Sequence, residues 1–259
     1  MTGLAAFTLW RRELTRFCRQ PSRIAGAAGT PLLFWLLLGS GLSGSFRLPG
    51  GPAGLDYLEY FFPGTVVLVL LFAAIFSNIS VIEDRNQGFL QGVLVAPVPR
   101  SALVAGKVLG GATLAWLQGV VFLALAPASG IRLTAPSALA AAGVLALLAL
   151  GLTALGFAFA WKLDSVQGFH AVMNVVLFPM WLLSGSFFPL SGAPRWLAAL
   201  MRLNPLTYGV AALRWALYGT AASLGSGLPG PGLSLGLTLA LGLAAFAAGL
   251  LATRGGRVE

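Results

Sequence analysis

Residues 81–107 read VIEDRNQGFLQGVLVAPVPRSALVAGK, a polar interruption in an otherwise apolar sequence. Glu83, Asp84 and the amides after them precede an apolar run at helical spacing, and Pro97 and Pro99 follow it. Acids in a first turn favour a helix because they oppose the partial positive charge of its N-terminus, and proline stops the helix from continuing. The stretch therefore predicts a short helix that begins near Glu83 and ends before Pro97.

Long uncharged windows lie on both sides of this stretch. Of the 259 residues, 58% are hydrophobic and 9% are charged, whereas about a quarter are charged in an ordinary soluble domain. Each window holds 23 residues or more, and about 20 apolar residues cross the hydrocarbon core as a helix. Continuous rather than alternating apolar residues favour helices over a barrel. The sequence therefore predicts an all-α polytopic membrane protein with six transmembrane helices. The windows are 24–46, 60–82, 108–131, 133–161, 165–194 and 215–253.

The 16 lysine and arginine residues, which dominate a net charge of +9, are unevenly distributed. Eleven lie before the first span, between spans two and three, after span four or at the C-terminus. Because such residues are enriched on the cytoplasmic side, both termini and residues 83–100 are predicted to be cytoplasmic. Membrane topology and lipid contact account for this charge, so we expect no nucleic acid partner. The first window is too long for a cleaved signal peptide, and the single cysteine, Cys18, excludes an intramolecular disulfide.

The N-terminal segment 1–23 contains a basic amphipathic helix. Its apolar side chains, Trp10 among them, recur every three or four residues, and Arg12 and Arg16 fall on the opposite face. We expect the helix to lie in the cytoplasmic interface with its guanidinium groups toward anionic membrane lipids. Its polar face, which also carries Glu13, is a candidate docking surface for a soluble partner.

The last third of the chain departs from regular spans. Pro179 interrupts span five, and a stretch rich in glycine, serine and proline follows it. Residues 195–219 form two amphipathic runs separated at Asn204 and Pro205, and their three arginines indicate an interfacial or re-entrant helical pair. The predicted single domain, 1–259, contains the interface helix 1–23, spans 24–42, 60–82, 102–126, 137–160, 166–185 and 233–252, the coupling segment 83–100, and the outer re-entrant helices 186–219.

Two motifs resemble the ABC-2-type permeases, the membrane subunits of ATP-driven exporters. The first, which is similar to that family's cytoplasmic coupling segment, is Glu83-Asp84-Arg85-(x)2-Gly88-(x)5-Leu94-(x)2-Pro97-(x)2-Arg100-(x)5-Gly106-Lys107. The second comprises SGSFFPL at 184–190, RLNPLTY at 202–208 and Ala212-Leu213-Arg214. The order of parts also matches, from the basic N-terminal helix to the broken segment between spans five and six. The resemblance covers nearly the whole chain.

The resemblance implies a dimer of permeases, either homodimeric or heterodimeric, in a cell inner or plasma membrane. Each copy would dock an ABC ATPase subunit through the N-terminal helix and the coupling segment. The candidate coupling residues are Glu83, Asp84, Arg85, Gly88, Leu94, Pro97 and Arg100. The chain has no GxxxxGK[ST] motif, whose backbone N–H groups and lysine hold nucleotide phosphates. We therefore expect it to be a transport subunit without cofactors, with ATP and Mg²⁺ bound by the partner subunit.

Two other classes of function compete with the permease interpretation. An ion-coupled secondary transporter is the alternative, since Pro179 and the residues after it resemble a broken-helix binding site in span five. However, no acidic residue lies at the centre of a span. An intramembrane enzyme is disfavoured because the chain has only one histidine, His170, which excludes a multi-histidine metal site.

Uncharged polar residues in the spans are candidates for the transport pathway. Asn78 and Asn174 lie in spans two and five, and Ser184 and Phe187 lie in the broken segment. Hydrogen bonds between helices are the alternative role for such residues, and the sequence leaves both open. A largely apolar lining fits a drug, lipid or lipid-linked glycan as substrate.

Overall fold

The computed structural model describes residues 2–44, 56–219, 227 and 229–255, and every regular element within them is helical. The helices are α1 (Thr2–Cys18), α2 (Pro21–Leu42), α3 (Tyr57–Asn86), α4 (Phe89–Val95), α5 (Arg100–Leu123), α6 (Ala135–Lys162), α7 (Val166–Trp181), α8 (Arg195–Leu203), α9 (Pro205–Tyr218) and α10 (Pro231–Gly255). Six helical segments are long and apolar enough to cross a membrane: α2, α3, α5, α6, α10, and α7 with the turn that follows it. The predicted class of fold is confirmed.

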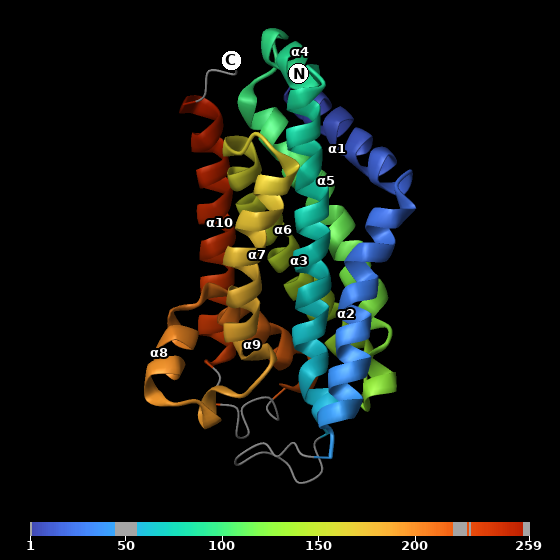
Figure 1. Cartoon of the computed structure of the whole chain (residues 1–259), viewed down its shortest axis with the longest axis vertical. Helices are drawn as coiled ribbons and strands as arrows, with labels where there is room; N and C mark the ends of the chain where they lie inside the picture. The colour runs from blue at the N-terminus through green and yellow to red at the C-terminus, as the bar shows by residue number, and fades with distance from the viewer. Residues whose placement is uncertain (1, 45–55, 220–226, 228, 256–259) are drawn as a thin grey trace.

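The six long segments run side by side, with α4 at one end of the bundle and α8 at the other (Figure 1). We call these the α4 end and the α8 end. The first helix, α1, lies at the α4 end, tilted against the spans, and α10 finishes at the same end. The centre of the bundle is α3, whose most apolar window is 89% buried. A helix that is apolar on all sides is stable only when other helices surround it, here α2, α5, α6 and α7.

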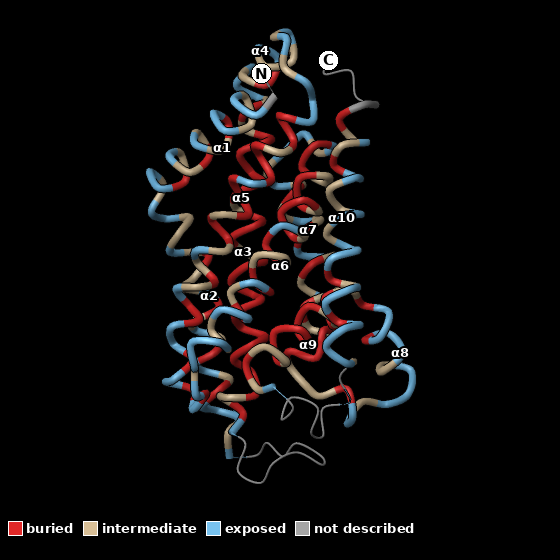
Figure 2. The backbone as a smooth tube through the Cα atoms, turned by 180° about the vertical axis from the view of Figure 1, so that it is seen from behind, coloured by how far each residue is buried: buried red, intermediate tan, exposed pale blue. Residues whose placement is uncertain are grey.

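Exposed residues mark the outer faces of the bundle along the backbone trace (Figure 2). The most apolar windows of α2, α10 and the α7 segment are only 22%, 17% and 22% buried. Their exposed leucine and valine side chains would be costly in water and are the expected contacts for lipid tails or another protein in a membrane. The core therefore lies between α3, α5 and α6.

The short helix of residues 81–107 begins later than the sequence predicts. Glu83, Asp84 and Arg85 form the last turn of α3, and Gly88, with φ of 74°, separates that helix from α4. Acidic residues at a helix C-terminus are unfavourable because that end carries partial negative charge, but here basic side chains from three other helices neutralise them. Glycine fits the left-handed conformation at the break without steric strain. The prediction that the acids begin the short helix is therefore wrong.

The last third contains the predicted break, but the break lies after Pro179, which is still inside α7. After α7 the chain forms an irregular helical turn, Leu182–Ser186, in which Gly185 has φ of 80°, and then continues into α8 and α9. Asn204 separates these two helices, and its side chain accepts a hydrogen bond from the backbone N–H of Leu206 at 3.1 Å. Pro205 occupies the first position of α9, where its missing N–H costs no hydrogen bond.

Candidate functional site

A buried cluster of charged side chains ties together the helices of the α4 end. Asp84 is fully buried, and the guanidinium group of Arg12 binds its two carboxylate oxygens at 2.7 and 2.8 Å. Arg16 donates to the same carboxylate at 2.5 Å, and the ammonium group of Lys107 completes its environment. Because α1, α3 and α5 contribute these groups, the cluster fixes α1 against the bundle.

Glu13 and Glu83 extend the cluster in two directions. Glu13 accepts hydrogen bonds from Lys107 at 2.7 Å and from the Ser80 hydroxyl at 2.6 Å. Glu83 accepts from Arg16 at 2.7 Å and from Arg23 of α2. Seven residues form this charged cluster: Arg12, Glu13, Arg16, Arg23, Glu83, Asp84 and Lys107. Removing one partner from such a buried network leaves an uncompensated charge, so the cluster is sensitive to single substitutions.

Two glycines of α5 allow α1 to approach closely enough for these contacts. A Cβ atom on Gly106 would lie 2.6 Å from the Cβ of Leu9, and one on Gly110 would lie 2.7 Å from the Cβ of Glu13. Small residues four positions apart are a known signal for close helix packing in membranes. In the sequence, Gly106 and Lys107 stand out only as part of a motif, and this packing role is not predicted from it. The GxxxG spacing could have indicated it.

From the sequence we expected the arginines of the N-terminal helix to point outward, toward the membrane lipids. In the structure only some of them do. Arg12 and Arg16 are turned toward the carboxylates of α3, while Arg11 and Arg19 are exposed. The hydrogen bonds with Asp84 raise the pKa of Arg12 above its ordinary value, so this group stays charged at neutral pH. On another side of α1, the Trp10 indole donates to the Thr113 hydroxyl of α5 at 3.1 Å.

Arg85 and Arg100 bind other helix ends. The guanidinium group of Arg85 donates to carbonyl oxygens of Trp161 and Leu163 at the end of α6, and it binds the carboxylate of Asp164 at 3.2 Å. Arg100 donates to the carbonyl of Thr253 near the end of α10. Basic groups at a helix C-terminus satisfy its free carbonyls and oppose its dipole. The predicted coupling residues therefore connect α3 and α5 to their neighbours.

An apolar groove lies next to the charged cluster, between α1 and α4. Its volume is about 610 Å³. Its lining consists of Leu4, Ala5, Thr8 and Leu9 of α1, Phe89, Gly92 and Val93 of α4, and residues 96–99, which include Pro97. We call it the α1–α4 groove. The Arg12 guanidinium group lies 3.8 Å from the centre of the Phe89 ring, so the charged cluster also holds α4 in place. Leu90 anchors α4 in the core, and Leu94 is half-buried against it.

The candidate pathway residues lie in different environments. Asn78 is buried, and its amide donates to the carbonyl of Ala74 at 2.8 Å and to that of Thr153 in α6 at 3.1 Å. It therefore joins two helices within the chain and does not reach the surface. Asn174, in contrast, is exposed on α7.

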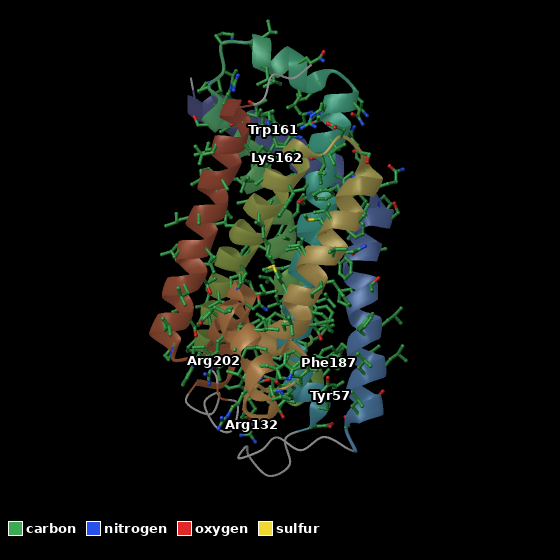
Figure 3. All side chains as sticks on the ribbon, turned by 60° about the vertical axis from the view of Figure 1, so that its left-hand side comes forward. Tyr57, Arg132, Trp161, Lys162, Phe187 and Arg202 are labelled. Atoms are coloured by element: carbon green, nitrogen blue, oxygen red, sulfur yellow. The ribbon has the colours of Figure 1, made fainter. Side chains whose placement is uncertain are left out.

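Ser184 and Phe187 belong to the broken segment at the α8 end. The Ser184 hydroxyl is buried and donates to the carbonyl of Trp181 at 2.6 Å. Phe187 lies beside Tyr57, the first residue of α3 (Figure 3), and its carbonyl accepts a hydrogen bond from the Tyr57 hydroxyl at 2.9 Å. These contacts attach the break to the central helix.

Arg214 of α9 is a buried cation at this break. Only 4% of its surface is exposed, and its guanidinium group lies 4.0 Å from the centre of the Tyr60 ring. It donates to the carbonyl of Gly185 at 2.9 Å, an oxygen that also accepts from the Tyr60 hydroxyl at 2.8 Å. The structure thus joins α3, the break and α9 through one carbonyl. In the sequence, Arg214 belongs to a motif, but nothing near it predicts this contact.

Six helical segments able to span a membrane, with a charged cluster and an apolar groove at one end and a broken helix at the other, define a polytopic membrane protein of the all-α class. A model of the ABC-2 type transporter family matches residues 5–218. The chain belongs to that family.

Curated relatives agree with the match. The chain is 30% identical over 213 residues to a putative transport permease, ycf38, of Cyanophora paradoxa, covering 81% of this chain and 72% of the relative. It is 28% identical over 224 residues to the inner membrane transport permease YadH of Escherichia coli K12, covering 83% and 84%. It is 25% identical over 227 residues to the daunorubicin resistance ABC transporter permease protein DrrB1 of Streptomyces coeruleorubidus, covering 85% and 77%.

Proposed function

We propose that this permease is the membrane subunit of an ATP-binding cassette exporter, driven by a separate ATPase subunit that binds ATP and Mg²⁺. The α1–α4 groove is the observation that carries this proposal. It is apolar and open, and its neighbours Leu4, Phe7 and Val95 are 74%, 55% and 88% exposed. Exposed apolar groups around a groove are typical of a protein interaction site.

The charged cluster supplies a route for coupling. Because Arg12 contacts both Asp84 and Phe89, the two walls of the groove are held to the end of α3. A displacement of α4 by the ATPase would then move α1 and the central helix together. Of the coupling residues named from the sequence, Glu83 and Asp84 act in this proposal behind the docking surface, by holding it rigid, whereas Pro97 lines the groove itself.

We place the α4 end, with both chain termini, on the cytoplasmic side, because the positive residues gather there. A cysteine introduced at the exposed Gln91 of α4, with Cys18 replaced, should react only with reagents applied from the cytoplasmic side. Labelling of this cysteine from outside intact cells would show that the permease has the opposite orientation in the membrane.

A second copy of the permease would complete the pathway. Asn174 and Gln167 are exposed polar residues on α7, in a segment that spans the membrane. Polar side chains facing lipid are costly, so we expect another polar surface to cover them. The two α7 faces would line a path for a drug, a lipid or a lipid-linked glycan. The first of these classes agrees with the name of the relative DrrB1, which refers to daunorubicin resistance.

The structure gives less support to the ion-coupled alternative. A cation site at a broken helix needs free carbonyl groups or a carboxylate. Here the Gly185 carbonyl is bound by the Arg214 guanidinium group and the Tyr60 hydroxyl. A buried positive charge at that position would repel a bound cation.

The test of this proposal compares two threonines of α1. Thr8 and Thr15 are both exposed, seven residues apart, and each donates its hydroxyl proton to the carbonyl four residues earlier at 2.9 Å. Only Thr8 lines the α1–α4 groove. Thr8→Phe should fill the groove and weaken binding of the ATPase subunit by about tenfold, ~1.4 kcal/mol, while Thr15→Phe should leave it unchanged.

Binding is measured between the purified, lipid-reconstituted permease and its cognate ATPase subunit, together with transport per ATP hydrolysed. Equal affinity for the two variants would exclude the groove as the docking site. ATP hydrolysis by the purified permease alone would contradict the division of labour between the two subunits.

A further inference from the structure

A second apolar groove crosses the membrane-spanning part of the chain, between α6, α7, α9 and α10. Its volume is about 430 Å³. Its walls include Leu155 of α6, Val176 and Met180 of α7, and Leu241, Ala245 and Ala248 of α10. Thr238 supplies the only side-chain hydroxyl of the lining, and that hydroxyl already donates to the carbonyl of Ser234 at 2.7 Å. We call it the α7–α10 groove.

The chemistry of the α7–α10 groove restricts what can fill it. A buried water needs two to four polar partners, and the side chains of the walls offer only the Thr238 hydroxyl, which is too few to hold an ordered water column. A helix with its side chains is about 10 Å wide and needs far more room than this volume gives. A single flexible hydrocarbon chain fits both the apolar walls and the size.

The α8 end of the groove leads to a basic helix. Pro205 and Leu206 line the groove and are separated from α8 only by Asn204. The junction is firm, because the Asn204 amide donates to the carbonyl of Met180 at 2.5 Å and the Tyr208 hydroxyl donates to the carbonyl of Arg202 at 2.8 Å. Figure 3 places Arg202 near the corresponding end of α10. The exposed guanidinium group of Arg202 forms no salt bridge with the residues that the structure describes.

The surface of α8 matches a membrane interface. Trp196, Leu200 and Leu203 share one face and are 66%, 46% and 80% exposed. Arg195 and Arg202 are exposed beside this face. A helix with an apolar face and arginines beside it lies at the boundary between acyl chains and headgroups, where arginine binds phosphate.

We propose that the α7–α10 groove and Arg202 together bind one anionic phospholipid from the leaflet on the α8 side, as a structural ligand. One acyl chain occupies the groove between α7 and α10, and the phosphate group binds the Arg202 guanidinium group. The groove supplies the apolar part of the site and α8 supplies the charge. The occupant is a membrane phospholipid rather than a transported molecule, because the groove lies on the side of α7 that packs against its own bundle.

The bound chain would support the broken segment. Met180 lies one residue before the end of α7, and Leu206 is the second residue of α9. The acyl chain of the lipid would therefore contact both sides of the break. This inference rests on the membrane location of the helices and not on the proposed ATPase partner. Its failure would leave the docking proposal intact.

The experiment uses two neighbouring alanines of α10. Both Ala247 and Ala248 are exposed, but only Ala248 lines the groove. The full-length permease is purified in a mild detergent and titrated with dioleoylphosphatidylglycerol or dioleoylphosphatidylcholine, and bound lipid is counted by native mass spectrometry. Wild type should retain one phosphatidylglycerol per chain, and Ala248→Phe should bind it about tenfold more weakly, whereas Ala247→Phe should bind like wild type.

A third variant distinguishes binding of the lipid headgroup from binding of the acyl chain. Arg202→Gln should bind the two lipids equally, with phosphatidylglycerol reduced to the level of phosphatidylcholine. Each variant is first shown by size-exclusion chromatography to elute as a single folded species like wild type. The proposal is wrong if wild type retains no lipid, or if the two phenylalanine variants bind lipid equally. A retained preference for phosphatidylglycerol in Arg202→Gln would exclude Arg202 as the phosphate ligand.

Discussion

Asp84 is the residue on which the α4 end depends most. It accepts hydrogen bonds from Arg12, Arg16 and Lys107, which come from α1 and α5. Its carboxylate is fully buried, so these three cations replace the water that it loses on folding. The sequence singled out Asp84 as a coupling residue, but its partners show that it first holds the N-terminal helix in place.

Asp84→Asn should destabilise the permease strongly. The substitution leaves buried positive charges without their partner, which costs roughly 3–5 kcal/mol in comparable pairs. We expect a loss of unfolding free energy near the lower end of this range, because two of the cations retain another partner. Lys107 still pairs with Glu13, and Arg16 still pairs with Glu83. Unfolding of the purified protein in mixed detergent micelles measures the difference.

The matched control is Asp164→Asn. Asp164 also pairs with an arginine, Arg85, but its side chain is 94% exposed. Exposed pairs contribute little to stability, so this variant should unfold like wild type. If the two variants unfolded alike, the charged cluster would have no special role.

At the scale of elements, the break after α7 is held by the first turns of α3. The Trp181 indole donates to the carbonyl of Gly64 at 2.7 Å, and the Tyr60 hydroxyl donates to that of Gly185. Gly64 lets the two backbones approach, since a Cβ atom there would lie 2.9 Å from the Cα of Ser186. The geometry of the break is therefore decided by contact with a helix more than one hundred residues earlier.

Gly64→Ala should displace the break and reduce transport. The added methyl group would also lie 2.4 Å from the Cβ of Ser186, so the backbone must move. Overpacking of this kind costs typically about 1–3 kcal/mol. Gly143→Ala in α6 meets nothing within 4 Å and is the control. Transport and thermal stability in liposomes should fall for the first variant only, and equal behaviour would show that the close contact has no consequence.

At the scale of the whole molecule, the described bundle has faces that a single chain leaves uncovered. Val175 is 74% exposed beside Asn174 on α7, and Leu239 is 48% exposed on α10. In our proposal a second permease covers α7, while lipid covers the outer face of α10. The same bundle would thus present one face to a copy of itself and another to the membrane.

Single-cysteine cross-linking in membranes distinguishes the two faces. In a Cys18→Ser background, Val175→Cys should form disulfide-linked dimers on oxidation, because a disulfide needs Cα atoms within about 7 Å. Leu239→Cys should stay monomeric under the same conditions. Cross-linking through Leu239→Cys alone would place the second copy on α10 and overturn the proposed pathway.

The sequence by itself determined the class of fold, the number of spans and the family. Hydropathy and charge spacing are local properties, so windows such as 60–82 could be recognised without knowledge of their neighbours. The same local reading placed Glu83 and Asp84 at the start of a helix, because it contained no information about basic groups elsewhere in the chain.

Only the tertiary structure decided which charges meet. Arg16 and Asp84 are 68 residues apart, and Arg214 is 154 residues from Tyr60. Such pairs form because helix packing brings them into a medium of low dielectric, where a charge must find a partner or a hydrogen bond. The two apolar grooves have the same origin, since each is a space between helices whose lining residues are separated in sequence and brought together by packing alone.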